Sequence, residues 1–259
     1  MTTDARRPAA AAPARPPGWI WRNRDLVATP VIVVVGLALV LLYTARRQLD
    51  SVEQRALDPS YLWAKFVEHI WLVAASTVLV IAIALPLGIA LSRPAVDRIR
   101  TGTLALGSFM QALPPYGVII LLAFLFKFGT TTAIIALVVA SFLPVLTNTV
   151  VGLRQVDPAL IEVARGMGMS AWQTLLRVEI PLAVPVMVAG IRVALVLNVG
   201  TATLATFIGA GGLGEPISSM LYLGRAQAVF VASAIVAALA LLIDWLAGVA
   251  ERLVSSRVG

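Results

Sequence analysis

Residues 152–185 read GLRQVDPALIEVARGMGMSAWQTLLRVEIPLAVP, a polar stretch between two strongly apolar runs. Asp157 is a good helix N-cap, and Pro158 suits the first helical position because its missing N–H would be unpaired there anyway. Apolar residues then recur at i, i+3, i+4 and i+7, which predicts a short amphipathic helix. They are Leu160, Val163, Ala164 and Met167.

A second short helix is expected directly after the first. Gly166 and Gly168 supply a turn, and Ser170 with Gln173 fits a capping box. The apolar ridge of the second helix is Trp172, Leu175 and Leu176, and Pro181 marks entry into the next apolar run. A compact helix pair with its own caps suits the transmission of force to a soluble partner, or it packs only on its own membrane domain.

Outside this stretch the chain is too apolar for a soluble protein of its size. Of its 259 residues, 59% are hydrophobic and 13% are charged, and the mean hydropathy is +0.93. The apolar runs are about 17 to 27 residues long, which fits helices and not the short alternating strands of a barrel. The sequence therefore predicts an all-α polytopic membrane protein with six spans: Val27–Tyr43, Ile70–Leu91, Leu104–Phe126, Thr131–Val151, Leu182–Ile208 and Ala226–Ala250.

The distribution of positive charge predicts the orientation. If the N-terminus is cytoplasmic, thirteen of the 20 lysines and arginines lie in inside segments, and six lie in outside segments. This bias favours both termini in the cytoplasm of a cell membrane protein and places residues 152–181 there too. The net charge of +7 then reflects topology and requires no nucleic acid.

The same pattern divides the chain into parts. We expect a disordered, basic cytoplasmic tail over residues 1–26, an extra N-terminal span over 27–43, an extracytoplasmic segment over 44–65, the main membrane domain over 66–251, and a cytoplasmic tail over 252–259. A cleaved signal peptide is the alternative for the first span, but the apolar run is long for one and YTARRQLD is a poor cleavage site. Asp58-Pro59-Ser60 fits a helix start.

Several classes of active site are excluded or poorly supported. The two lysines, Lys65 and Lys127, do not follow a glycine, so a Walker-type nucleotide site is missing. With zero cysteines and one histidine, thiolate chemistry and HExxH zinc sites are excluded, and no metal site is expected. His69 is expected to be an interfacial residue and not a catalytic base. The chain is predicted to move a solute, without being an enzyme or carrying a cofactor of its own.

The spacing of the polar stretch resembles a known motif. Glu162-Val163-Ala164, three residues, Gly168, nine residues and then Val178-Glu179-Ile180-Pro181 are similar to the EAA loop, E-A-A-x3-G-x9-I-x-L-P. That loop belongs to the permeases of binding-protein-dependent ABC importers. Val163, Val178 and Ile180 depart from it, while the spacing is intact. The resemblance extends from about His69 to Glu251.

The resemblance implies a type I ABC importer permease, with the main domain as its transmembrane part and residues 152–181 as its coupling loop. Glu162 would orient the loop, Gly168 would make its turn, and Val163, Ala164 and Pro181 complete the motif. The coupling ridge would be Leu160, Met167, Trp172 and Leu175. Implied partners are a cytoplasmic ABC ATPase that binds the ATP, an extracytoplasmic substrate-binding protein and a second permease copy, identical or related.

Three further stretches resemble one branch of that family. VDPALIEVARGMGMS, PVMVAGIRVALVLNVGTATLATFIGAGGLGEPI and FMQALPPYGV are most similar to osmoprotectant permeases, which import glycine betaine, choline or carnitine. Methionine, phosphonate and sulfonate permeases carry related loops, so another small solute is the alternative. A secondary transporter or channel is the alternative of a different class, but the sequence shows no convincing inverted repeat and few embedded acids.

Small or polar residues recur every fourth position along the fifth predicted span. They are Gly190, Ala194, Asn198, Ala202, Thr206 and Ala210. Such a stripe permits close helix packing, or it lines a translocation path. The candidate path residues are Gln111, Asn198, Thr201, Thr203 and Thr206. The following GAGGLGEP is expected to be a flexible external turn.

Arg192 is a cation well inside the same span, about 16 Å from Pro181 at 1.5 Å per residue. An unpaired charge at this depth is costly. Asp244, in the last span, is the comparable anion, so we expect an ion pair between Arg192 and Asp244. A substrate contact is the alternative, although a fixed cation would repel choline. Since only 7% of the residues are aromatic, no high-affinity aromatic cage is expected here.

Overall fold

The computed structural model describes residues 24–258, and all regular elements in this range are helices. The expected N-terminal tail, residues 1–26, therefore lies almost wholly outside the described residues. The long helices are α2 (Arg24–Ala45), α4 (Pro59–Leu91), α7 (Thr130–Arg154), α10 (Ile180–Ala202) and α12 (Ala226–Val258). The shorter helices are α3 (Ser51–Ala56), α5 (Asp97–Ala112), α6 (Pro115–Leu125), α8 (Pro158–Gly166), α9 (Ala171–Thr174) and α11 (Gly214–Tyr222). Three tight turns complete the chain: 3-10 turns at Pro94–Val96 and Thr203–Ile208, and a π-helical turn at Leu175–Glu179.

The predicted all-α membrane fold is confirmed, but the third span differs. Five helices are long and apolar enough to cross a membrane. The expected continuous span Leu104–Phe126 is instead α5 and α6, which are bent by 100° relative to each other. Leu113 and Pro114 both precede a proline, which disfavours helical backbone, and they adopt extended ψ values of 139° and 124°. The helix is therefore broken at this point, and the expected single helix is two.

Helix α4 begins well before the apolar run that predicts it. The Asp58 side chain accepts hydrogen bonds from the backbone N–H groups of Ser60 and Tyr61, at 2.9 and 3.2 Å, so Asp58-Pro59-Ser60 is a helix start. The Ser60 hydroxyl, followed by these two N–H groups, lowers the pKa of Asp58. The span predicted from Ile70 is thus the second part of a helix that starts at Pro59.

Helix α7 lies at the centre of the bundle, between α4 and α10. Its contacts are close because glycines face it from both neighbours. A Cβ at Gly190 would lie 2.6 Å from the Asn148 Cβ, and a Cβ at Gly88 would lie 2.7 Å from the Thr149 Cβ. Small residues at helix interfaces permit this backbone approach in membranes. The stripe in α10 therefore packs on α7 at this point.

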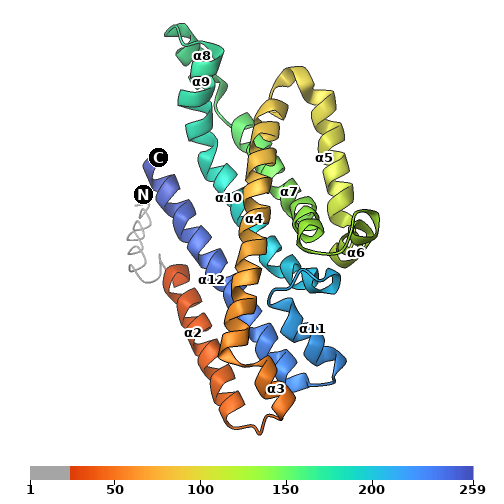
Figure 1. Ribbon diagram of the computed structural model, residues 1–259. Helices are drawn as coiled ribbons and strands as arrows, with labels where there is room; N and C mark the ends of the chain where they lie inside the picture. Colours follow the sequence, from red (N-terminus) through yellow and green to blue (C-terminus); the bar gives the residue numbers. More distant parts are fainter. Residues whose placement is uncertain (1–23, 259) are drawn as a thin grey trace, which may run out of the picture.

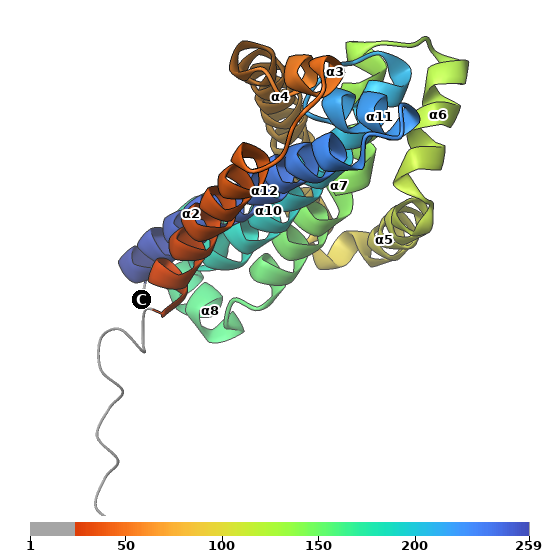
Figure 2. The same cartoon turned by 90° about the horizontal axis from the view of Figure 1, so that it is seen from below.

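The elements separate into two ends of the bundle. Helices α8 and α9 project at one end, where α4 also connects to α5 (Figure 1). Helices α3 and α11 lie at the opposite end. We name these the α8 end and the α11 end. Helix α2 lies along α12 in both views, on the outside of the bundle (Figure 2).

Candidate functional site

The helix pair at the α8 end has the caps that its sequence predicts. The Asp157 side chain accepts a hydrogen bond from the Ala159 N–H at 2.9 Å at the start of α8. At the start of α9, the Gln173 N–H donates to the Ser170 hydroxyl and the Ser170 N–H donates to the Gln173 side chain, at 3.3 and 2.9 Å. Both helices therefore begin at fixed points, although α9 is only 4 residues long.

Gly168 makes the turn between the two helices. Its φ of +85° lies in the left-handed region, which other residues adopt at a cost. The Gly168 N–H donates to the Arg165 carbonyl at 2.9 Å, and the Met169 N–H donates to the Ala164 carbonyl at 3.1 Å, so the last carbonyls of α8 are paired. A side chain at Gly168 would have open space around it, so its backbone conformation alone requires glycine.

An apolar surface covers the outside of the pair. We call it the ridge, and it consists of Leu160, Val163, Met167, Trp172 and Leu176. Between 46% and 67% of each of these residues is exposed. Apolar side chains gathered in this way on a polar helix pair mark a site of contact with another molecule.

Leu175 does not belong to this ridge. It is only 7% exposed and packs in a cluster with Leu153, Ala183 and Met187 at the base of the pair. Leu175 and Leu176 follow Trp172 at i+3 and i+4 and so lie on opposite sides of its direction, and the Leu175 side packs on the bundle. Leu176 takes the exposed position instead.

The motif residues have different environments. Ala164 is buried, at 1% exposure, and anchors α8, while Glu162 is exposed. Among residues 26–256, whose side chains the structure describes, the Glu162 carboxylate makes no hydrogen bond or ion pair, so the orienting contact expected of it is not made inside this part of the chain. Pro181, half-buried, lies in the first turn of α10.

Glu179 makes a contact that the sequence did not predict. Its carboxylate, 5% exposed, forms a two-pronged pair with the Arg93 guanidinium, with N–O distances of 2.5 and 3.3 Å. Arg93 follows α4, and Glu179 ends the π-helical turn before α10. The pair therefore joins the root of the helix pair to the connection between α4 and α5. Glu179 occupies a variable position of the motif, so the motif itself indicates no role for it. The one sequence signal for a partner was an acidic residue directly before a membrane span.

The candidate path residues lie in two environments. Gln111 and Thr201 line one small cavity of about 110 Å³ between α5, α6, α7 and α10. Asn198 is fully buried and donates to the Thr77 hydroxyl on α4 at 3.0 Å, so it packs helices together. The Thr203 hydroxyl donates to the Gly200 carbonyl of its own helix at 2.7 Å. Thr206 belongs to a separate cavity at the α11 end.

Arg192 and Asp244 form an ion pair in the structure. The guanidinium donates to both Asp244 oxygens, at 2.7 and 2.8 Å. It also donates to Glu251 at 3.1 Å, a partner that the sequence analysis missed. Gly248 lies between the two acids on α12, and a Cβ there would be 3.0 Å from the Arg192 Cζ. The arginine therefore lies flat on α12 and fixes α10 to it.

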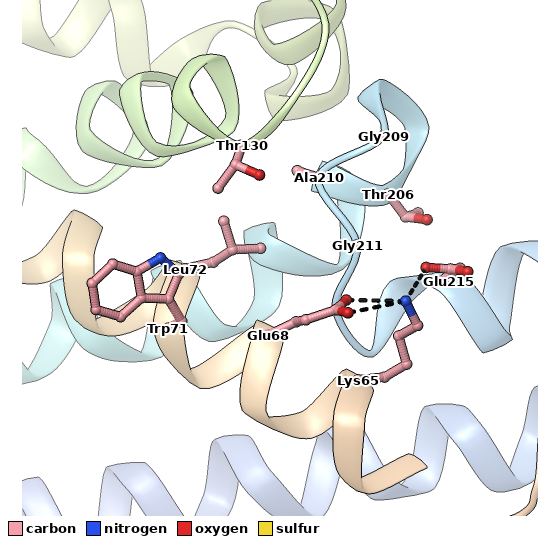
Figure 3. Close-up of a pocket in the computed structure, with 10 residues that line it drawn as sticks. All are labelled: Lys65, Glu68, Trp71, Leu72, Thr130, Thr206, Gly209, Ala210, Gly211 and Glu215. Atoms are coloured by element: carbon pink, nitrogen blue, oxygen red, sulfur yellow. Dashed lines mark hydrogen bonds and ion pairs between the residues drawn. The ribbon is translucent and has the colours of Figure 1, made fainter. Parts of the chain in front are cut away.

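The second cavity, of about 550 Å³, lies at the α11 end between α4, the start of α7 and the glycine-rich turn before α11 (Figure 3). Lys65 bridges two carboxylates across it, with distances of 3.1 Å to Glu68 and 2.7 Å to Glu215. The Gly212 N–H donates to Glu68 at 2.9 Å. The charged residues of this cavity therefore pair with each other and hold the turn on α4.

Two expectations for this end are wrong. The segment GAGGLGEP is packed on the bundle and is not a free turn, because Gly212 and Gly214 are buried and a Cβ at Gly214 would collide with the Thr203 backbone. His69 is not interfacial: it is fully buried, with Nε2 3.1 Å from the Val199 carbonyl. An imidazole with a backbone carbonyl partner satisfies part of its polarity inside the bundle, which hydropathy does not reveal.

Comparison with known proteins places the chain among transport proteins. Residues 84–256 match the family described as "Binding-protein-dependent transport system inner membrane component". This range begins within α4 and includes the helix pair, the ridge and the Arg192 cluster.

Curated relatives cover most of the chain. An osmoprotectant import permease protein, OsmY, of Salmonella typhimurium is 38% identical over 82% of this chain and 89% of its own length. The carnitine transport permease protein OpuCD of Listeria monocytogenes is 38% identical, over 74% of this chain and 86% of its own. The glycine betaine/carnitine/choline transport system permease protein OpuCB of Bacillus subtilis is 37% identical, over 73% and 87%.

Solved structures share the fold. The MetNI methionine ABC transporter in an inward-facing conformation aligns with a TM-score of 0.68 and 23% identity, over 74% of this chain and 95% of that chain. An amino acid ABC transporter aligns with a TM-score of 0.65 and 16% identity, over 80% and 99%. The matched family model and the relatives show that this chain belongs to the binding-protein-dependent transport system inner membrane components, the permeases of ABC importers, and the shared fold agrees with this.

Proposed function

We propose that this chain is the membrane-spanning subunit of an ATP-driven importer of osmoprotectants such as glycine betaine, choline or carnitine. The names of the relatives that are 37% to 38% identical support this solute class. The observation that carries the mechanism is the ridge, because it exposes five apolar side chains on a helix pair with the spacing of an ATPase-coupling loop.

The ridge would dock on a cytoplasmic ATPase, which binds the ATP because this chain has no Walker-type site. Movement of the helix pair would be transmitted to α10 through the π-helical turn. It would be transmitted to the α4–α5 connection through the Arg93–Glu179 pair. The binding of ATP would then shift the population between inward-open and outward-open states of the bundle. Glu162 would find its partner on the ATPase.

The proposal assigns the remaining parts as follows. Residues 66–251 form the permease domain, with the coupling loop at 152–181. Helix α2 is an additional helix that spans the cell membrane. The α8 end faces the cytoplasm with both termini, and the α11 end meets an extracytoplasmic binding protein. A second permease copy completes the path, to which Gln111 and Thr201 contribute. Substrate affinity resides mainly in the binding protein, since the chain has few aromatics.

Uptake of labelled glycine betaine tests this function. The permease would be reconstituted in proteoliposomes with its ATPase and binding protein, with ATP on the side of the ATPase. We expect ATP-dependent uptake that choline and carnitine reduce and methionine does not. If methionine alone reduces uptake, the chain is still the permease of an importer, but for a different solute. Uptake without ATP would contradict the ABC mechanism.

A further inference from the structure

An apolar groove runs between α2 and α12 on the outside of the bundle. Gly36, Leu39, Val40 and Tyr43 of α2 line it together with Phe230 of α12, and its volume is about 570 Å³. The rings of Tyr43 and Phe230 meet edge to face, with centroids 5.6 Å apart. A Cβ at Gly36 would meet nothing within 4 Å, so the absent side chain contributes to the open space.

The groove lies where lipid surrounds the protein. Helix α2 is a candidate span of which only 11% of the apolar window is buried inside the protein, so its outer surface faces the bilayer. From Gly36 to Tyr43 the groove extends about 10 Å along the helix axis. One leaflet contributes about 15 Å to the hydrocarbon core. The groove therefore covers most of the depth of one leaflet and suits a hydrocarbon chain lying along the helix.

Two arginines stand at the end of the groove that points to the α11 end. Arg47 lies just after the end of α2 at Ala45, and its Cζ lies 5.3 Å from the centre of the Tyr43 ring, which lines the groove. Arg46 is adjacent, and both side chains are exposed. Among residues 26–256, whose side chains the structure describes, neither guanidinium has a carboxylate partner, so two positive charges at headgroup level lack a counter-charge from this part of the chain.

The acids of this chain near that level are already engaged. Asp50 pairs with Arg225 at 2.7 Å, Glu53 accepts from the Asp50 N–H, and Asp58 caps α4. Glu68 and Glu215 are paired with Lys65. A second copy of the chain packed on the groove would thus bring no unpaired carboxylate from this set to the two arginines. A phospholipid supplies both a hydrocarbon chain and an anionic phosphate.

We propose that the groove between α2 and α12 binds one anionic phospholipid. One acyl chain lies along Gly36, Val40 and Tyr43 against Phe230, and the lipid phosphate accepts hydrogen bonds from Arg47 and Arg46. The α2 side of this site lies outside the range matched by the family model, which begins at residue 84, whereas Phe230 lies within that range. It does not depend on the transported solute.

Native mass spectrometry of the full chain tests the proposal. The protein would be extracted from nanodiscs that contain equal amounts of phosphatidylglycerol and phosphatidylcholine with identical acyl chains. We expect the wild type to retain one phosphatidylglycerol. The double variant R46Q/R47Q should bind it roughly twentyfold more weakly, since each arginine near an anionic headgroup contributes about a fivefold factor. Gly36→Leu, which fills the groove, should reduce retention of the same lipid while keeping both arginines.

Arg55→Gln is the matched control, because Arg55 is an exposed arginine of the same segment outside the groove. It should retain phosphatidylglycerol as the wild type does. Equal loss in Arg55→Gln and R46Q/R47Q, or equal retention of phosphatidylcholine, would overturn the proposal, since either result means that no selective site exists. A dimer that Gly36→Leu disrupts would overturn it in favour of a second copy in the groove.

Discussion

Gly168 determines the geometry of the helix pair at the scale of a single residue. Its φ of +85° costs a non-glycine residue about 1–2 kcal/mol. The turn is exposed and no atom lies within 4 Å of a Cβ built there, so substitution disturbs the turn without disturbing the core of the bundle. Stability of the membrane domain and geometry of the ridge are therefore separable at this position.

We predict that Gly168→Asp inserts and folds normally but loses most ATP-driven uptake, at least about tenfold. The strained turn moves Met167 and Trp172 relative to each other, and the added carboxylate must be desolvated on docking. Uptake and ATPase activity in proteoliposomes measure this effect. Gly168→Asn is the control, because asparagine adopts the left-handed region about as aspartate does but carries no charge that must be desolvated, and it should retain more uptake. If Gly168→Asp transports as the wild type does, the docking surface lies elsewhere.

Arg192 shows how far residue-level prediction extends. The cost of an unpaired charge in a span predicts a partner, and Asp244 is that partner at 2.7 Å. Glu251 was missed because it lies near the end of the last span, where an acid can face water. Glu251 lies seven residues after Asp244, which places both acids on the same face of α12. This spacing was the sequence signal for a second partner of Arg192.

At the scale of elements, the Arg93–Glu179 pair connects two segments that are 86 residues apart in the chain. It lies at the root of the helix pair, and the carboxylate is nearly excluded from solvent. Removing the Arg93 charge would leave this buried carboxylate uncompensated, which is unfavourable, whereas the Arg93 side chain is 38% exposed and can still reach water when Glu179 is neutralised. The pair therefore fixes the angle at which α9 enters α10, and a shift of the helix pair must also shift the start of α5.

We predict that Glu179→Gln lowers the ratio of transport to ATP hydrolysis by about fivefold or more, while the ATPase still binds. The exchanged variant R93E/E179R should recover part of this ratio, because it restores a pair of opposite charges. Asp97→Asn is the matched control: at the same end Asp97 pairs with Arg100 and, at 3.2 Å, with Arg154, and because 52% of the Asp97 side chain is exposed, its loss should change little. Equal effects of Glu179→Gln and Asp97→Asn would assign the pair to packing alone.

Hydropathy predicted which elements exist better than it predicted how they bend. The sequence predicted the features that depend on local chemistry, namely the apolar runs, the caps at Asp157 and Ser170 and the helix start at Asp58. The sequence predicted one continuous span where α5 and α6 are separate helices. Two adjacent prolines permit either a kink or a sharp bend, and packing decides between them. The inward Leu175 depends on which side of α9 packs on the bundle, and a single sequence does not show that side.

At the scale of the whole molecule, the proposed orientation and the proposed coupling depend on each other. The ridge and the Arg93–Glu179 pair lie at the α8 end, while the glycine-rich turn and its cavity lie at the α11 end (Figure 1). The arginine bias predicts that the α8 end is cytoplasmic. An ATPase can dock on the ridge only if this orientation holds.

Single cysteines measure the orientation directly, because the natural chain contains none. We predict that Ser51→Cys, exposed at the start of α3, reacts with a membrane-impermeant maleimide in intact spheroplasts. Ala159→Cys, exposed at the start of α8, should react only after the membrane is permeabilised. Both positions are exposed in the first turn of a short helix, so a difference in labelling reports the side of the membrane and not burial. Labelling of Ala159→Cys from outside would place the ridge beyond the reach of a cytoplasmic ATPase, and the coupling mechanism would then be wrong even if the chain transports an osmoprotectant.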